Sequence, residues 1–373
     1  MKEQRVFVTD VVRTPLGAPG KGLDRFMSSD LAAKAILRLL EKNALDPLAV
    51  DQVVLGQSLP STMPNNIGHF AWLKAELPVD VPGYTVQSNA DSGLQALRNA
   101  YNLVATGNER IVLAGGADSY SAAPFVMRDV RLHFFPQDRI VIDSLDEAEC
   151  CTQPEPMSRK EQFEKAHGEE SEAAKAFRAA EEEKAAALAG LLGDELVPMS
   201  WVDRKKGEIV INADEWPGRA KEGPLSPNAD CAAVTLAVSE EALAAKGLKP
   251  AAELLGFASL GGSPDDPVKA GAEAVKKLLA KKWLKAEDVA LFEIAENSAD
   301  DVLETAAALN VPAEKINPFG GALAFGRCDG AEGILMLQRL LHALRPGECG
   351  VIALYSAGGM GMAALMKKTD CRI

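Results

Sequence analysis

The stretch Tyr84-Thr85-Val86-Gln87-Ser88-Asn89-Ala90-Asp91-Ser92-Gly93-Leu94 changes from a β-rich run into the first turn of a helix. Apolar residues continue at Leu97, Tyr101 and Val104, a spacing that predicts one face of that helix. A strand-to-helix turn directs one side chain out of the sheet, where the helix N-terminus stabilises a thiolate or an oxyanion. Ala90 occupies this position. A methyl group can use neither effect, so the turn has the form of a nucleophile site without its nucleophile.

The segments on both sides of this turn alternate between strands and helices. We predict strands at Val6–Thr9, Val53–Leu55 and Ile111–Ala114, the last ending at Gly115-Gly116, and a helix at Asp30–Asn43. Such alternation is typical of a layered α/β domain.

The chain contains an internal repeat. The apolar pattern of residues 39–53 recurs without gaps at residues 278–292, an offset of 239, and Leu113-Ala114-Gly115-Gly116 is similar to Ser356-Ala357-Gly358-Gly359, an offset of 243. Two copies of one α/β unit, packed around a pseudo-two-fold axis, explain this repeat. Their equivalent loops then converge on one site.

A polar, irregular segment interrupts the first copy. We predict a long charged helix at about Ser158–Leu192 and a hairpin strand at Gly207–Ile211. The expected organisation is a first core half at residues 1–119 and 223–240, an inserted helical cap at 120–222, and a second core half at 241–373.

Composition excludes several classes of protein. The 373 residues carry a net charge of −13, which argues against nucleic-acid binding. No apolar run approaches the roughly 18 residues of a membrane span, so we expect a cytoplasmic protein without a membrane segment. The six cysteines and four histidines are scattered, and no zinc-ligand spacing is present.

Five ordered motifs together resemble the thiolases, which make or cleave 3-ketoacyl-CoA. They are Val8–Gly17 ("AVRTPIG"), Val112–Ser119 ("VVAGGMES"), Ser226–Ala233 ("SGxNDGAA"), Gly320–Gly326 ("GGAIALG") and Ala357–Gly361 ("GGGMG"). The resemblance spans the chain. It implies a thiolase-like fold: duplicated βαβαβ-type core domains in an α/β/α/β/α arrangement, with an inserted loop domain.

The resemblance also implies four chemical groups, and all four are replaced here. The nucleophilic cysteine becomes Ala90, the asparagine of "NEAF" becomes Ala295, the histidine of "GHPxG" becomes Arg327, and the second cysteine becomes Tyr355. Arginine stays protonated and tyrosine has an ordinary pKa near 10, so both are poor bases. We therefore expect no thiolysis or Claisen condensation through a covalent thioester.

Part of the binding machinery is expected to survive. The family's second oxyanion hole is made by backbone N–H groups, here those of Ala90 and Ala357. Ser226 matches the serine that contacts the pantetheine arm, and Arg219 and Lys221 remain to meet the 3′-phosphate. Coenzyme A or an acyl-CoA is thus the expected ligand, with no metal and no resident cofactor.

Two residues are candidates for altered chemistry. Cys328, beside Arg327, is either a relocated nucleophile or a small buried residue. Glu296, which survives from "NEAF", either joins Tyr355 and Arg327 in acid–base chemistry or is a structural carboxylate paired with Arg327.

Asp91 and Ser92 are expected to cap the helix that follows Ala90.

Three functions follow as hypotheses. The first is a non-catalytic homologue that acts as an acyl-CoA-binding or partner subunit, either a homodimer or homotetramer or a hetero-oligomer with an active thiolase. The second is an enzyme with non-covalent acid–base chemistry on an acyl-CoA, of the retro-aldol or hydration type. The third is an acetyl-CoA acetyltransferase, against which the four replaced residues argue.

Overall fold

The computed structural model describes residues 4–59, 65–127, 140–145, 157–215 and 223–370. The first core half contains β1 (Val6–Val8), β2 (Val12–Arg13), α1 (Ser28–Lys42), η1 (Pro47–Ala49), β3 (Gln52–Gly56), α2 (Ile67–Lys74), β4 (Gly83–Val86), α3 (Ser92–Ala105), β5 (Ile111–Asp118) and β10 (Cys231–Ser239). The second contains α7 (Glu240–Lys246), β11 (Ala252–Gly261), α8 (Pro267–Lys281), η3 (Ala286–Asp288), β12 (Leu291–Ile294), α9 (Ala299–Leu309), η4 (Ala313–Lys315), α10 (Ala322–Phe325), α11 (Glu332–Ala343), β13 (Cys349–Ser356) and β14 (Met360–Lys368).

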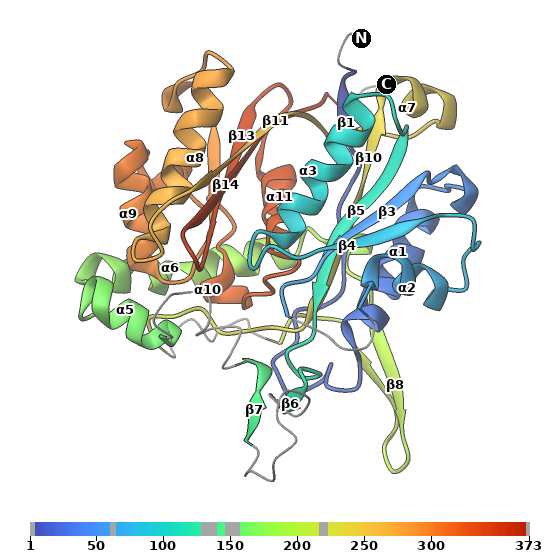
Figure 1. Ribbon diagram of the computed structural model, residues 1–373, viewed down its shortest axis with the longest axis horizontal. Helices are drawn as coiled ribbons and strands as arrows, with labels where there is room; N and C mark the ends of the chain where they lie inside the picture. Colours follow the sequence, from blue (N-terminus) through green and yellow to red (C-terminus); the bar gives the residue numbers. More distant parts are fainter. Residues whose placement is uncertain (1–3, 60–64, 128–139, 146–156, 216–222, 371–373) are drawn as a thin grey trace, which may run out of the picture.

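The strands and helices form five layers, as the fold class predicts (Figure 1). The strands follow the order β12-β13-β14-β11-β1-β10-β5-β3-β4, with β2 beside β10. Helices α3 and α11 lie between the two halves of this sheet, α1 and α2 cover one outer face, and α8 and α9 cover the other. Alternate residues of one strand therefore enter different cores: Val6 and Val8 pack in the central core, and Phe7 packs in an outer one.

The duplication is visible element by element. Helices α1 and α8 each have 15 residues and begin 239 positions apart, as do η1 and η3, so the first predicted offset is confirmed. The second predicted offset is wrong. Gly115-Gly116 lie within β5, whereas Gly358 and Gly359 form the turn after β13 with φ of 86° and 78°. The two eight-residue strands β5 and β13 begin 238 positions apart.

Within the described residues 157–215 of the insertion, two helices occupy the stretch where the sequence predicted one. Its elements are β6 (Phe125–Met127), β7 (Val141–Asp143), α5 (Arg159–His167), α6 (Glu172–Ala189), η2 (Gly193–Glu195), β8 (Met199–Asp203) and β9 (Gly207–Ile211). Gly168, with φ of 71°, ends α5, and Ser171 caps α6. The predicted strand at 207–211 is confirmed as half of the β8–β9 hairpin.

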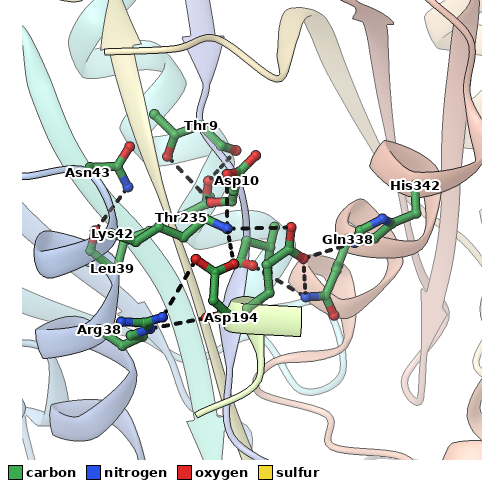
Figure 2. Close-up of polar contacts among 12 residues, drawn as sticks. Thr9, Asp10, Arg38, Leu39, Lys42, Asn43, Asp194, Thr235, Gln338 and His342 are labelled. Atoms are coloured by element: carbon green, nitrogen blue, oxygen red, sulfur yellow. Dashed lines mark hydrogen bonds and ion pairs between the residues drawn. The ribbon is translucent and has the colours of Figure 1, made fainter. Parts of the chain in front are cut away.

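A polar network joins the insertion to both core halves (Figure 2). Lys42 of α1 lies 2.7 Å from Asp194 and 3.3 Å from Asp10. Glu195, next to Asp194 in η2, accepts a hydrogen bond from the Gln338 amide and contacts the ring of His342, both on α11. Short charged contacts thus fix η2 between α1 and α11.

None of the described helices has both the length and the apolar character needed to cross a lipid bilayer.

Candidate functional site

The turn before α3 is fixed by its own backbone and by Ser92. Asn89 has a left-handed φ of 50°. The Ser92 hydroxyl accepts a hydrogen bond from the Ser88 N–H at 2.8 Å and donates one to the Asn89 carbonyl at 2.6 Å. This arrangement projects Ala90 from a constrained turn at the helix N-terminus. Asp91 occupies the predicted N-cap position of α3, but its side chain makes no capping bond. The predicted capping role of Ser92 is wrong, because its hydroxyl bonds backwards into the turn.

Residues from both core halves surround a cavity of about 60 Å³ next to Ala90, the inner cavity. Its wall includes Asn89, Ala90, Tyr120, Asn297, Arg327, Asp329, Tyr355, Ser356 and Ala357. The expected convergence of equivalent loops is therefore present. Ala90 and Ala357, the two residues predicted to supply oxyanion N–H groups, share this wall, and the Asn89 amide donates to the Ala357 carbonyl at 3.4 Å.

Arg327 places a held positive charge in the inner cavity. Its Nη1 donates to the side-chain oxygen of Asn297 at 2.7 Å, and its Nε lies 3.1 Å from Asp329. The loop that carries it is pinned, because the Gly330 N–H donates to Asp118 at 2.7 Å. Backbone packing also restricts the position of this loop, because a Cβ on Gly116 would lie 1.7 Å from the Gly330 carbonyl oxygen.

Glu296 is buried away from the inner cavity. It accepts hydrogen bonds from the Asn317 amide at 2.6 Å and the Leu323 N–H at 2.8 Å. Burial, and then the nearby carboxylate of Glu181, raise the pKa of Glu296 well above its ordinary value. The predicted pairing of Glu296 with Arg327 is therefore wrong, and of the predicted trio only Tyr355 and Arg327 line the cavity.

Ala295 is the first residue after β12; it is buried, and its N–H donates to the Ala353 carbonyl.

Tyr355 lies on the wall between the inner cavity and a larger one of about 340 Å³, the outer cavity. Its hydroxyl donates to Asp301 at 2.9 Å and accepts from the Asn297 N–H at 3.4 Å. The other carboxylate oxygen of Asp301 lies 2.8 Å from His167 Nε2. Burial, and then Asp301, raise the pKa of Tyr355 well above 10.

Helix α5 forms the opposite wall of the outer cavity. Arg159, at its start, donates to the Ser226 carbonyl at 3.0 Å and hydroxyl at 3.2 Å. Ser226 is 1% exposed and belongs to neither cavity wall. The residue predicted to meet pantetheine is thus covered by Arg159. Arg219 and Lys221 lie outside the described residues.

Cys328 has the surroundings of a packed thiol. It is fully buried, its Sγ donates to the Cys231 carbonyl at 3.3 Å, and it does not line the inner cavity. Burial raises the pKa of Cys328 well above 9. This geometry favours the buried-residue interpretation.

Two buried carboxyl groups lie next to segments that line the inner cavity. Asp91 follows Ala90 in the chain, and Asp118 accepts hydrogen bonds from the N–H groups of Ser58 and Leu59. Burial raises the pKa of Asp91 to about 8, with a smaller contribution from Asp329. Burial also raises the pKa of Asp118 to about 8, although the Leu59 and Gly330 N–H groups oppose the shift. Burial therefore favours the protonated form of both groups.

Sequence reasoning missed four residues of this site. Asn297 and Asp329 lie inside the two altered motifs, close to replaced positions, and no role was predicted for them. His167 and Asp301 lie 134 positions apart, and no spacing rule connects them. Among the described residues, no group of histidine, cysteine and acidic side chains is arranged to hold a metal ion.

Comparisons with known proteins cover almost the whole chain. Residues 6–227 match the thiolase N-terminal domain, and residues 248–368 match the thiolase C-terminal domain. Proteins named probable acetyl-CoA acyltransferase from Staphylococcus epidermidis and Staphylococcus aureus are 30% and 31% identical, each alignment covering 98% of this chain and 99% of the relative.

Solved structures agree with the sequence relatives. The acetyl-CoA acetyltransferase of Bacillus anthracis superposes with a TM-score of 0.90 at 26% identity, over 98% of this chain and 99% of the other. The Acat5 thiolase of Ascaris suum, in complex with coenzyme A, gives 0.85 at 26% identity, over 98% and 100%. The chain belongs to the thiolase family.

Proposed function

We propose that this protein binds an acyl-CoA at the inner cavity and does not carry out thiolase acyl transfer. The observation that supports this most directly is Ala90 at the head of α3, on a cavity wall to which no described cysteine contributes. Covalent acyl transfer needs an activated nucleophile. The two described thiols nearest to the site, Cys231 and Cys328, are fully buried.

Two features support thioester binding. Ala90 and Ala357 face one cavity, which suits a carbonyl oxygen held by two backbone N–H groups. Arg327 adds a positive charge beside them, held by Asn297 and Asp329. The described part of the outer cavity wall contains four acidic and three basic side chains. We therefore expect it to hold the uncharged pantetheine arm rather than phosphates.

A second activity, acid–base chemistry on the bound acyl-CoA without a covalent intermediate, is favoured by one observation. Tyr355 and the Arg327–Asp329 pair line the same cavity as Ala90. A retro-aldol or hydration step needs such groups and no thiol.

Calorimetric titration with coenzyme A and acetyl-CoA, together with an acetoacetyl-CoA thiolysis assay, tests the proposal. We expect binding of acetyl-CoA without thiolysis, and no acetyl adduct in the intact mass of the protein. Sustained thiolysis, or a stoichiometric adduct, would contradict it.

We further propose that the chain assembles as a homodimer or homotetramer, or pairs with an active thiolase. All four residues of β4, at the end of the described sheet path, are half-buried, which leaves an edge available for pairing. Light scattering after size exclusion, with and without a co-expressed active thiolase, distinguishes these assemblies. A monomer under both conditions is the opposing result.

A further inference from the structure

A chain of three side chains connects the two cavities. The Tyr355 hydroxyl donates to one oxygen of Asp301 at 2.9 Å, and the other oxygen lies 2.8 Å from His167 Nε2. These residues come from β13, α9 and the inserted helix α5. Tyr355 lines both cavities, whereas Asp301 and His167 line only the outer one.

The inner end of this chain cannot act as a base unaided. Tyr355 is 3% exposed, and its pKa is raised well above 10, first by burial and then by Asp301. Its hydroxyl already donates to Asp301, however. A proton that reaches the phenolic oxygen can therefore displace the proton already there, which Asp301 accepts.

The outer end contacts solvent and contains a histidine, His167. The side chains of His167 and Asp301 are 15% and 13% exposed. The hydrogen bond with Asp301 raises the pKa of His167 above 6.5, although burial opposes the shift. The other charged groups that face His167 are Asp300 and Glu304, also on α9, and the Phe163 ring packs against it from α5.

We propose that Tyr355 and Asp301 form a proton relay for a thioester bound beside Ala90, and that His167 controls it. This proposal rests on the proposed binding of an acyl-CoA. The α-C–H bond of the thioester breaks, and its electron pair remains as an enolate held by the N–H groups at Ala90 and Ala357. The proton binds the Tyr355 oxygen, whose own proton moves to Asp301. The reverse sequence returns a proton exchanged with solvent in the outer cavity.

The charge on His167 sets how readily Asp301 accepts that proton. Protonated His167, 2.8 Å away, stabilises the Asp301 carboxylate and makes it a weaker base. Neutral His167 removes this effect. The relay therefore runs faster as pH rises through the pKa of His167.

Hydrogen–deuterium exchange at the methyl group of acetyl-CoA tests the relay in the full-length protein. Acetyl-CoA is incubated with the protein in D₂O, and deuterium uptake is followed by mass spectrometry from pH 6 to 9. For the wild type we expect a rise of about tenfold over this range, because the stabilisation of the Asp301 carboxylate by protonated His167 is lost. Tyr355→Phe and Asp301→Asn should each lower exchange by about 100-fold, a usual contribution of general base catalysis.

His167→Gln tests the control by His167 directly, because a histidine with a purely structural role would not set the pH dependence of exchange. It should flatten the pH dependence to within about twofold while leaving exchange measurable. Asp91, whose pKa burial raises to about 8, is retained in this variant, so the comparison with the wild type isolates His167. His342→Gln is the matched control: this histidine also contacts a carboxylate, Glu195 at 2.9 Å, but lies outside both cavities, so its profile should be that of the wild type.

The outcomes separate the two proposals. Absence of acetyl-CoA binding by calorimetry overturns the proposed function and the relay with it. Binding without exchange, or an unchanged pH profile in His167→Gln, overturns the relay alone. If circular dichroism shows that Asp301→Asn is unfolded, the His167→Gln profile decides.

Discussion

At the scale of single residues, the inner cavity combines a methyl group at the head of α3 with ionisable side chains. Ala90, Arg327 and Asp329 line the cavity, and the buried carboxyl group of Asp91 follows Ala90 in the chain. Arg327 and Asp329 form an ion pair at 3.1 Å, and Arg327 also donates to Asn297. Asp91 has no such cation against it and remains protonated instead, so its charge state is linked to folding.

Asp91→Asn should alter how stability depends on pH. The pKa of Asp91 is about 8 in the folded chain, against an ordinary value near 4, so the native state holds a proton that the unfolded chain releases between these values. The wild-type free energy of unfolding therefore falls as pH rises from 5 to 8, by up to about 1.4 kcal/mol per pH unit from this group. Asparagine cannot titrate, so the stability of the variant relative to the wild type should increase over the same range and then level off.

Urea unfolding at pH 5, 6, 7 and 8 measures this difference. The exposed Asp24→Asn provides the control and should show a constant difference. A constant difference for Asp91→Asn would contradict the buried, protonated state.

At the scale of elements, the helices and strands of the core could be predicted from the sequence, whereas the division of the inserted helix into α5 and α6 could not. The predicted helices at 30–43 and from Ser92 correspond to α1 and α3, because their apolar residues recur with helical period and pack on one face. The predicted strand at 111–114 continues to Asp118, since Gly115 and Gly116 pair with β10 rather than ending the strand. In the insertion, the four residues 168–171 separate α5 from α6, beginning with Gly168 at a left-handed φ of 71°.

The candidate site could also be predicted only in part: its motif positions were predicted, but the contacts between distant elements were not. The positions of Ala90, Arg327 and Tyr355 could be predicted because each lies in or beside a short motif, and all three line the inner cavity. The contacts of Tyr355 with Asp301 and His167 depend on how α5 docks against α9. No local pattern encodes that docking, and the same reason explains why Glu296 was assigned the wrong partner.

Ser158→Ala should loosen α5 selectively. Ser158 and Glu161 form a reciprocal capping box, with bonds of 3.3 Å and 2.7 Å. Loss of such a cap costs about 1 kcal/mol, so amide exchange in residues 159–167 should accelerate about fivefold. Ser171→Ala, at the cap of α6, is the matched control and should affect the first turn of α6 only. Peptide-level hydrogen exchange measures both, and equal acceleration in α5 and α6 from either variant would contradict local capping.

At the scale of the whole molecule, the two core halves and the insertion are joined by buried polar contacts. Arg13 of β2 forms a bidentate pair with Asp214 at 2.6 and 2.7 Å and donates to Gln338 of α11 at 3.0 Å. Gln338 in turn donates to Glu195. One guanidinium therefore connects the first half, the second half and the segment after β9.

Asp214→Asn should destabilise the whole chain. The side chains of Arg13 and Asp214 are 2% and 3% exposed, so the variant leaves a buried charge without its partner. Such a loss costs about 3–5 kcal/mol. Asp203→Asn, on the exposed β8–β9 turn of the same insertion, should cost less than about 1 kcal/mol. Equal stability of the two variants in chemical denaturation would show that the Arg13–Asp214 pair does not stabilise the fold.

The close approach of Gly116 to Gly330 gives the loop at 327–330 an anchor that does not depend on the side chains facing the cavity. Main-chain packing and the hydrogen bond from the Gly330 N–H to Asp118 provide this anchor. Arg327 and Asp329, which line the inner cavity, are carried on the anchored main chain. We therefore expect substitutions at these two positions to change the charge of the cavity while the loop keeps its path.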